Sequence, residues 1–133
     1  VTCSNISKER DIEIRKLNAG THALSNTYLT NRWPKCQQGK QRLAASTEQD
    51  FSVETLLEIL GDSQPPLDNL LPQRGNTIEY ERRLGSAFVI GEDYGTRAST
   101  VLLVNHRKIT FHERSFGQKG STYQDLRNEL LLN

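Results

Sequence analysis

The stretch Ser99–Phe116, STVLLVNHRKITFHERSF, predicts a β-hairpin and with it the fold class of this chain. Residues 99–104 are almost continuously apolar, which is typical of a strand in a sheet covered on both faces. Residues 108–116 alternate between apolar and polar side chains, and the short segment NHRK joins the two runs as a tight connection. This pair of strands indicates a fold whose strands cluster rather than alternate strictly with helices.

Other strand signals lie on both sides of this hairpin. Residues 1–5 are typical of the end of a strand, and residues 11–17 show the alternation of a half-buried strand. Residues 21–26 follow a turn and predict a further strand, as does the short apolar run 86–91. The tail, residues 122–133, favours helix by its composition but edge strand by its place beside the hairpin, so both alternatives stay open.

A helix is predicted after the first group of strands. Pro34 suits the first turn of a helix, because its missing N–H has no helical partner there in any case. Residues 35–45 continue this helix, with Gly39 as a weak point. Further along, residues 61–77 hold three of the four prolines and predict a long surface loop.

The best-defined helix covers residues 53–60, where apolar side chains recur at the spacing of one helix face. Ser52 is suited to cap its start and Gly61 to end it. Phe51 and Leu56 lie where a hydrophobic staple joins the entering chain to the helix. With the strands described above, these helices predict an α+β protein.

Length and charge narrow the class of protein. At 133 residues the chain is one domain or part of one. Its 17 Lys and Arg balance 16 Asp and Glu, so it lacks the basic character expected of a nucleic-acid-binding domain. The longest aliphatic run, VLLV, is too short for a transmembrane helix, and no signal-peptide pattern is present. Because the chain opens on Val, we expect the natural N-terminus and any targeting segment to precede it.

The cysteines do not predict a disulfide framework. Cys3 and Cys36 are too few for one and lack the paired spacing of metal ligands. With three scattered histidines they predict no zinc site. We expect both to be reduced, half-buried thiols of an intracellular protein.

Two polar segments, residues 24–35 and 94–100, are candidates for ligand binding. They supply the candidate ligand-binding residues Ser25, Asn26, Trp33, Tyr94 and Arg97. The Asn26 amide can donate to a developing oxyanion, and Arg97, at the mouth of the most apolar strand, can favour a thiolate. The alternative is structural, with Asn26 tying a turn, Arg97 bridging a carboxylate and Trp33 packing at a helix start.

No nucleophile accompanies these polar groups. The sequence has no G-x-S-x-G elbow, and neither cysteine is paired by spacing with a His and an acid. Cys36 falls inside a predicted helix, and Cys3 becomes N-terminal only if the two residues before it are removed. The chain as given therefore lacks an obvious attacking group.

The same two segments resemble the second half of the transport and Golgi organisation 2 family, also called the NRDE family. In the first segment and just before it, the matching residues are Gly20, Leu24, Ser25, Asn26, Trp33, Pro34 and Lys35. In and after the second segment they are Tyr94, Gly95, Thr96, Arg97, Thr110, Phe111, Glu113 and Arg114. Ile6 departs from the family pattern, which often has Arg there, and the resemblance weakens in the proline-rich loop and the tail.

This resemblance implies a fold and a domain assignment. The family is expected to share the αββα sandwich of N-terminal nucleophile hydrolases, with mostly antiparallel sheets. Family members start with Met-Cys and carry an Asn-Arg-Asp-Glu motif in their first half, and neither is present here. Residues 1–133 are therefore expected to be the C-terminal half of a single NRDE-family domain.

The choloylglycine-hydrolase branch of that fold is similar in placing an Asn after a middle strand and an Arg at the start of a late strand. There the Asn helps to hold the oxyanion, and the Arg lies beside a Cys nucleophile. By this resemblance Asn26 and Arg97 are the candidate catalytic residues, supporting an oxyanion and a thiolate. The nucleophile would then belong to the half that is absent here.

Two functions follow from the resemblance. One is an intracellular carrier or homeostasis role, cytoplasmic or mitochondrial, in secretory-pathway organisation or in haem or acyl-lipid handling. The alternative is a Cys-dependent amidohydrolase that acts on non-peptide C–N bonds. No cofactor is evident, but haem is a candidate cargo, with His22, His106 and His112 as the available imidazoles. The expected partners are a small-molecule ligand and either a complementary N-terminal half or further copies of the chain.

Overall fold

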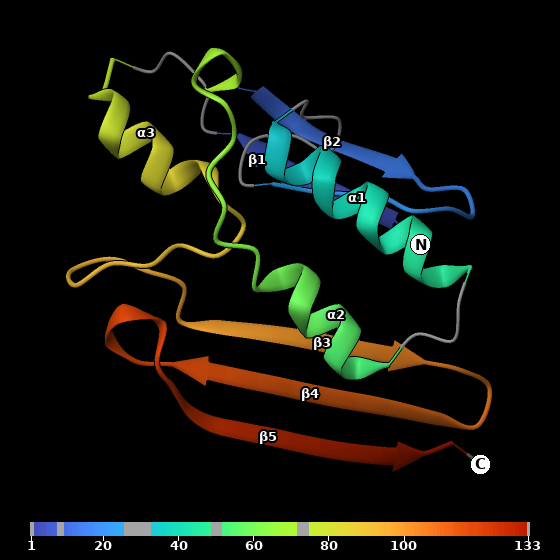
Figure 1. Cartoon of the computed structure of the whole chain (residues 1–133). Helices are drawn as coiled ribbons and strands as arrows, with labels where there is room; N and C mark the ends of the chain where they lie inside the picture. Colours follow the sequence, from blue (N-terminus) through green and yellow to red (C-terminus); the bar gives the residue numbers. More distant parts are fainter. Residues whose placement is uncertain (1, 8–9, 26–32, 49–51, 72–74, 133) are drawn as a thin grey trace.

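In the computed structural model the chain is an α+β protein, and the structure describes residues 2–7, 10–25, 33–48, 52–71 and 75–132. Over these residues three α-helices accompany two antiparallel sheets, one of two strands and one of three. Figure 1 shows the three-stranded sheet along one side, helix α2 across it, and helix α1 beside the two-stranded hairpin. The predicted α+β class is confirmed.

The predicted hairpin consists of β3 (Ala98–Val104) and β4 (Lys108–Phe116), with Val101 opposite His112. The tail forms β5 (Thr122–Leu131), which pairs antiparallel with β4. Hydrogen bonding to β4 decides between the two alternatives for the tail, because its composition alone favours a helix. Among the described residues, the order β3-β4-β5 leaves β3 and β5 as the two edges of this sheet.

The turn between β3 and β4 is closed by one side chain. The Oδ1 of Asn105 accepts hydrogen bonds from the backbone N–H groups of Arg107 (2.8 Å) and Lys108 (2.9 Å). An Asn that satisfies two backbone donors makes the connection a local one, which explains why neighbouring residues suffice to predict it. A short 3-10 turn, η2 (Gln118–Gly120), then leads from β4 to β5.

Helix α2 (Val53–Leu60) covers one face of this sheet and leaves the other open. Leu57 of the helix and Val101 of β3 are each only 5% exposed. On the opposite face Leu102 and Val104 are 59% and 64% exposed. The prediction that β3 is covered on both faces is therefore wrong within the described part of the chain, because only one layer of helix packs against it.

The two predicted helices are present. Helix α1 (Pro34–Thr47) begins at its proline, as expected, and runs slightly beyond the predicted range 35–45. Ser52 caps α2 through its side-chain oxygen, and the N–H of Gly61 donates back into the last turn at 2.8 Å. Phe51, one half of the predicted staple, lies outside the described residues.

A third helix, α3 (Ile78–Gly85), was not predicted. The side chain of Thr77 accepts from the backbone N–H of Tyr80 at 3.3 Å, glutamates fill the first turn and arginines the last. These are the capping and dipole signals of a short helix, so the sequence did contain the information. The described part of the predicted loop 61–77 is irregular apart from a 3-10 turn, η1 (Asp68–Leu70).

The predicted strand 86–91 is wrong, because its backbone groups bond to a distant loop and to side chains instead of joining a sheet. The N–H of Phe88 donates to the carbonyl of Asp62 at 2.8 Å, and the Ser86 hydroxyl donates to the carbonyl of Phe88 at 2.8 Å. The apolar side chains serve the core all the same. The ring of Phe88 meets that of Phe116 edge to face, with centroids 4.7 Å apart.

At the start of the chain, β1 (Thr2–Ser7) and β2 (Arg10–Lys16) form an antiparallel hairpin, which confirms both predicted strands. The strand predicted for residues 21–26 is not formed over residues 21–25, which are irregular. Asn26 lies outside the described residues.

Candidate ligand-binding site

A groove of about 770 Å³ lies between α1, α2 and β3. This volume falls within the range of small-molecule pockets, about 300–1,000 Å³. Most of the side chains that line it are aliphatic. The groove is therefore a candidate binding site in the described part of the chain.

One face of α1 forms a long wall of this groove. Cys36, Gly39, Lys40 and Leu43 recur at intervals of three and four residues, so helical geometry places them on the same face. At Gly39 an added Cβ atom would meet no heavy atom within 4 Å. The glycine thus leaves open space at the middle of the wall.

The remaining walls come from distant parts of the sequence. Helix α2 contributes Leu56, Ile59 and Leu60, which again share one helix face. Residues 100–103 of β3 lie along the groove, and the irregular segment 22–25 closes it. No single stretch of sequence therefore contains the site.

The charged side chains of the groove lining are basic. They are Lys35 and Lys40, beside the imidazole of His22, and no Asp or Glu lines the groove among the described residues. The ammonium of Lys35 donates to the backbone oxygen of Leu84 at 3.0 Å, which fixes its position. The Nε2 of His22 lies 3.0 Å from the carbonyl oxygen of Asn18, and since a carbonyl only accepts, Nε2 is the donor. These groups favour a ligand with an anionic end.

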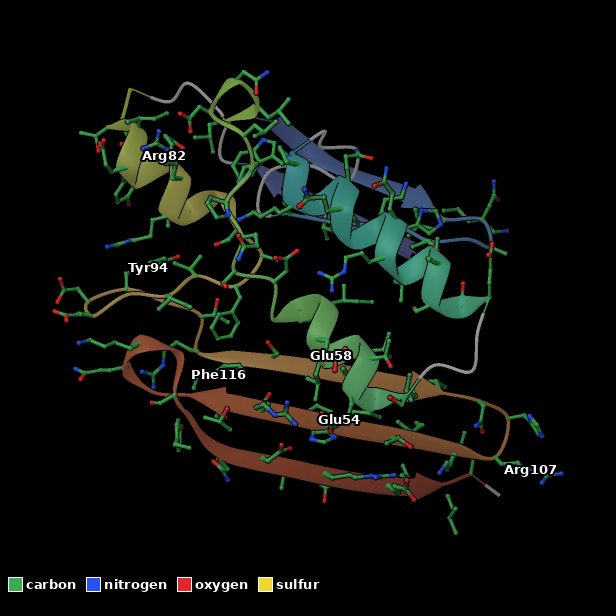
Figure 2. The ribbon with its side chains drawn as sticks, viewed as in Figure 1. Glu54, Glu58, Arg82, Tyr94, Arg107 and Phe116 are labelled. Atoms are coloured by element: carbon green, nitrogen blue, oxygen red, sulfur yellow. The ribbon has the colours of Figure 1, made fainter. Side chains whose placement is uncertain are left out.

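The predicted binding residues fall in different places. Ser25 lines the groove. Trp33 directly precedes the first residue of α1 and is not among the residues that line the groove. Tyr94 and Arg97 lie on the segment that leads into β3, where Tyr94 is 60% exposed (Figure 2). Of the described candidates the structure thus brings only Ser25 to the groove, and Asn26 lies outside the described residues.

The motif Tyr-Gly-Thr-Arg has a structural role that the sequence did not reveal. The backbone N–H of Thr96 donates to the carbonyl of Val89, and the N–H of Val89 donates to the Thr96 hydroxyl, both at 2.9 Å. A Cβ on Gly95 would lie 2.9 Å from the same Val89 oxygen, too close for any other residue. Gly95 and Thr96 therefore close the turn that precedes β3.

Cys36 is a free, half-buried thiol, as predicted, and it lies in the wall of the groove. The same prediction for Cys3 lies outside the described side chains. Within the described residues no group of three or more His, Cys, Asp or Glu side chains comes together to hold a metal ion. None of the described helices is both long enough and apolar enough to cross a membrane.

A polar cluster outside the groove joins the sheet to α2. His112 of β4 is 7% exposed and hydrogen-bonds through Nε2 to the carboxylate of Asp125 on β5. Arg114 spans Asp125, at 2.8 Å, and Glu54 of α2, at 3.1 Å. Figure 2 shows Glu54 on the part of α2 that overlies the sheet. The hydrogen bonds from His112 and then from Arg114 lower the pKa of Asp125.

This cluster predicts a loss of stability in acid. Because the folded state lowers the pKa of Asp125 below 3.8, its contribution is present above that value and is lost as the pH falls through the lowered pKa. The free energy of unfolding in urea should therefore fall less between about pH 7 and about pH 3 for Asp125→Asn than for the wild type. The control is Asp93→Asn, on an exposed turn. Its free energy of unfolding should fall over this pH range by as much as that of the wild type. An equal fall in Asp125→Asn and the wild type would contradict the assignment.

Comparison with known proteins agrees with the two sequence segments described above. The family Transport and Golgi organisation 2 matches residues 1–118. A relative from Bos taurus, Transport and Golgi organization protein 2 homolog, is 37% identical over 111 residues, covering 74% of this chain and 40% of that protein. No solved structure matches.

The fold and the groove define an α+β protein whose groove has mostly apolar walls and a few basic side chains. The family match gives this class a more specific name. The chain belongs to the Transport and Golgi organisation 2 family. It spans about two fifths of the length of its bovine relative. The family match ends before β5 begins.

Proposed function

We propose that this chain is part of a transport and Golgi organisation 2-like carrier whose groove holds an apolar molecule with an anionic end. An acyl lipid fits this description best, and haem is the second candidate. We place this role inside the cell, in the cytoplasm or in mitochondria. The observation that supports the proposal is the groove of about 770 Å³, which is apolar along its walls and basic at its polar positions.

The lining suits an acyl chain. Leu43 of α1 and Leu56, Ile59 and Leu60 of α2 offer a continuous aliphatic surface. Transfer of an apolar chain from water to such a surface is worth about 25 cal/mol per Å² buried. A flexible chain can follow this surface, whereas a flat ring system needs a slot of fixed width.

The basic side chains suit the anionic end. Lys40 is half-buried in the groove wall and has no ion-pair partner among the described residues. A carboxylate or phosphate beside it would gain a charge-assisted hydrogen bond, which is stronger than one between neutral groups. For haem, a neutral His22 that donates through Nε2 keeps the lone pair of Nδ1 for a metal.

The test uses Gly39, where a side chain would enter the groove without a clash. Gly39→Leu should weaken the binding of cis-parinaric acid, followed by its fluorescence, by roughly tenfold or more, since the leucine occupies the space of the acyl chain. Gln38→Leu, which places the same side chain on an exposed neighbour outside the groove, should leave the affinity unchanged. Equal affinity of Gly39→Leu and the wild type would contradict binding in this groove.

A second variant tests the anionic end of the ligand. Lys40→Glu should weaken binding of the fatty acid but not of the matching fatty alcohol, which has no charge. Titration with haemin, read from its Soret band, tests the second candidate, and His22→Ala should shift that band if His22 is a ligand. A loss of alcohol binding equal to that of the acid would contradict a role for the charge of Lys40.

We also propose the αββα sandwich for the complete domain, with residues 1–133 as its C-terminal half. The open face of the three-stranded sheet supports this proposal, because each of its three strands carries large apolar side chains there. These side chains are Leu102, Val104, Ile109, Phe111, Leu126 and Leu130, and Thr100, Glu113 and Asn128 are polar residues of the same face. Sheets of that kind pack face to face about 10 Å apart. A second sheet from the same domain would bury these side chains.

In the amidohydrolase alternative, Asn26 supports an oxyanion and Arg97 supports the thiolate of a nucleophile that lies outside this chain. We place it second, because Arg97 is not among the residues that line the groove. The two proposals differ in one variant. In a protein that also contains the N-terminal half, Arg97→Ala leaves the affinity for cis-parinaric acid unchanged if the groove is a carrier site, and it removes hydrolysis of an acyl amide if the alternative holds.

A further inference from the structure

Like the open face of the three-stranded sheet, the free edge of β5 has no partner among the described residues. Every residue of β5 is exposed, and β5 is paired on one side only among the described residues. An exposed strand edge is a template for pairing with another strand. β5 is therefore a candidate interaction surface, and its side chains indicate which partner fits it.

Strand geometry shows which backbone groups face outward. The N–H of Leu132, just after β5, donates to the carbonyl of Arg107, so even-numbered residues point their backbone groups toward β4. Because these groups alternate along a strand, Asp125, Arg127 and Glu129 present theirs at the free edge. The backbone donors and acceptors of the odd-numbered residues are thus free to bond to a further strand.

Three self-pairing registers suit these outward groups, and the charges distinguish them. With Arg127 opposite its own copy, Asp125 would face Glu129, so like charges would oppose each other throughout. With Leu126 opposite its own copy, Arg127 would face Asp125, which His112 and Arg114 already hold, and Leu130 would face the polar Thr122. Glu129 also has partners within its own chain, Arg127 and Lys108, so the apolar pairs decide between the last two registers.

The third register places Asn128 opposite Asn128 of a second copy. Arg127 then faces Glu129 of the other strand twice, beside the pair that these residues already make within one strand at 2.9 Å. On the other face of the ribbon, Leu126 pairs twice with Leu130, and both leucines are exposed in the single chain, by 42% and 61%. Opposite charges and apolar pairs directly across antiparallel strands both stabilise the pairing.

We propose that β5 is a dimerisation edge that pairs antiparallel with β5 of a second copy of this chain, centred on Asn128. The two three-stranded sheets become one sheet of six strands. The pairing uses the edge of the sheet, joins the open apolar faces of the two copies through Leu126 and Leu130, and leaves the groove available. It therefore goes beyond the proposed carrier function and does not depend on it.

Disulfide trapping tests the register directly. At the centre Asn128 and its copy form a non-hydrogen-bonded pair, whose Cα atoms lie about 4.5 Å apart, within reach of a disulfide. Asn128→Cys, with Cys3 and Cys36 replaced by Ser, should become a covalent dimer on mild oxidation. Leu126→Cys in the same background should not, since its copy would lie about 13 Å away along the strands. Trapping at Leu126 alone would overturn the register.

A charge exchange tests the contacts. One chain has a mass of 15.1 kDa, and the mass of the wild type measured by sedimentation equilibrium should approach twice that value. Arg127→Glu should weaken the dimer by about tenfold, because two pairs of carboxylates then face each other. The double variant Arg127→Glu with Glu129→Arg should recover part of the lost affinity, because the pairs across the strands are again opposite in charge while Lys108 loses its carboxylate partner. As a folding control, Arg127→Glu should melt at the same temperature as the wild type at low protein concentration. A monomeric wild type would overturn the proposal, and so would a dimer whose affinity Arg127→Glu does not change.

Discussion

Replacing Phe116 by Ala should lower the free energy of unfolding by about 3–5 kcal/mol, the range for removing a buried aromatic ring. Phe116 is 7% exposed, and its edge-to-face partner Phe88 is 6% exposed. The pair joins the last residue of β4 to the segment that carries the turn before β3. Figure 2 shows Phe116 at that end of the sheet. Urea unfolding followed by circular dichroism measures the loss.

The matched control for Phe116→Ala is Tyr123→Ala. Tyr123 is an aromatic residue nearby on β5 but is 63% exposed. Its removal should cost less than about 0.5 kcal/mol, as for other surface substitutions. Equal costs at the two positions would show that the ring pair does not form the core at this end of the sheet.

Gly91→Ala should destabilise the chain by about 2–3 kcal/mol, as overpacking against rigid atoms does. A Cβ atom on Gly91 would lie 2.3 Å from the backbone oxygen of Tyr94, so the backbone itself has to move. That movement would separate Val89 from Thr96 and break the two hydrogen bonds that close the turn before β3. Faster amide hydrogen exchange at Thr96 should accompany the lower melting temperature.

Gly39→Ala is the control with the opposite sign. Gly39 lies inside α1 with open space where its Cβ would be, so alanine should stabilise the chain by about 0.5–1 kcal/mol through its better helix propensity. The two substitutions are chemically identical and differ only in their surroundings. A similar effect at both positions would contradict the tight approach of Gly91 to Tyr94.

Elements held together by neighbouring residues could be predicted from the sequence. The hairpin Ser99–Phe116 closes on Asn105, and α2 begins and ends on its own capping residues, so both predictions are confirmed. Helix α3 has similar signals and could have been predicted too. The run 86–91 has the composition of a strand, but the N–H of Phe88 bonds to Asp62, which no local pattern indicates.

The sequence by itself determined the family, the α+β class and the hairpin, because each depends on residue types at fixed short spacings. The tertiary structure alone decided the candidate site. Its walls come from segments as far apart as Ser25, Gly39, Leu56 and Val101, and only packing brings them together. It also decided that the tail is a strand, since β4 offers hydrogen bonds that outweigh the helix preference of residues 122–131. Short-range propensities are small, whereas a ladder of backbone hydrogen bonds and a shared apolar face act over the whole element.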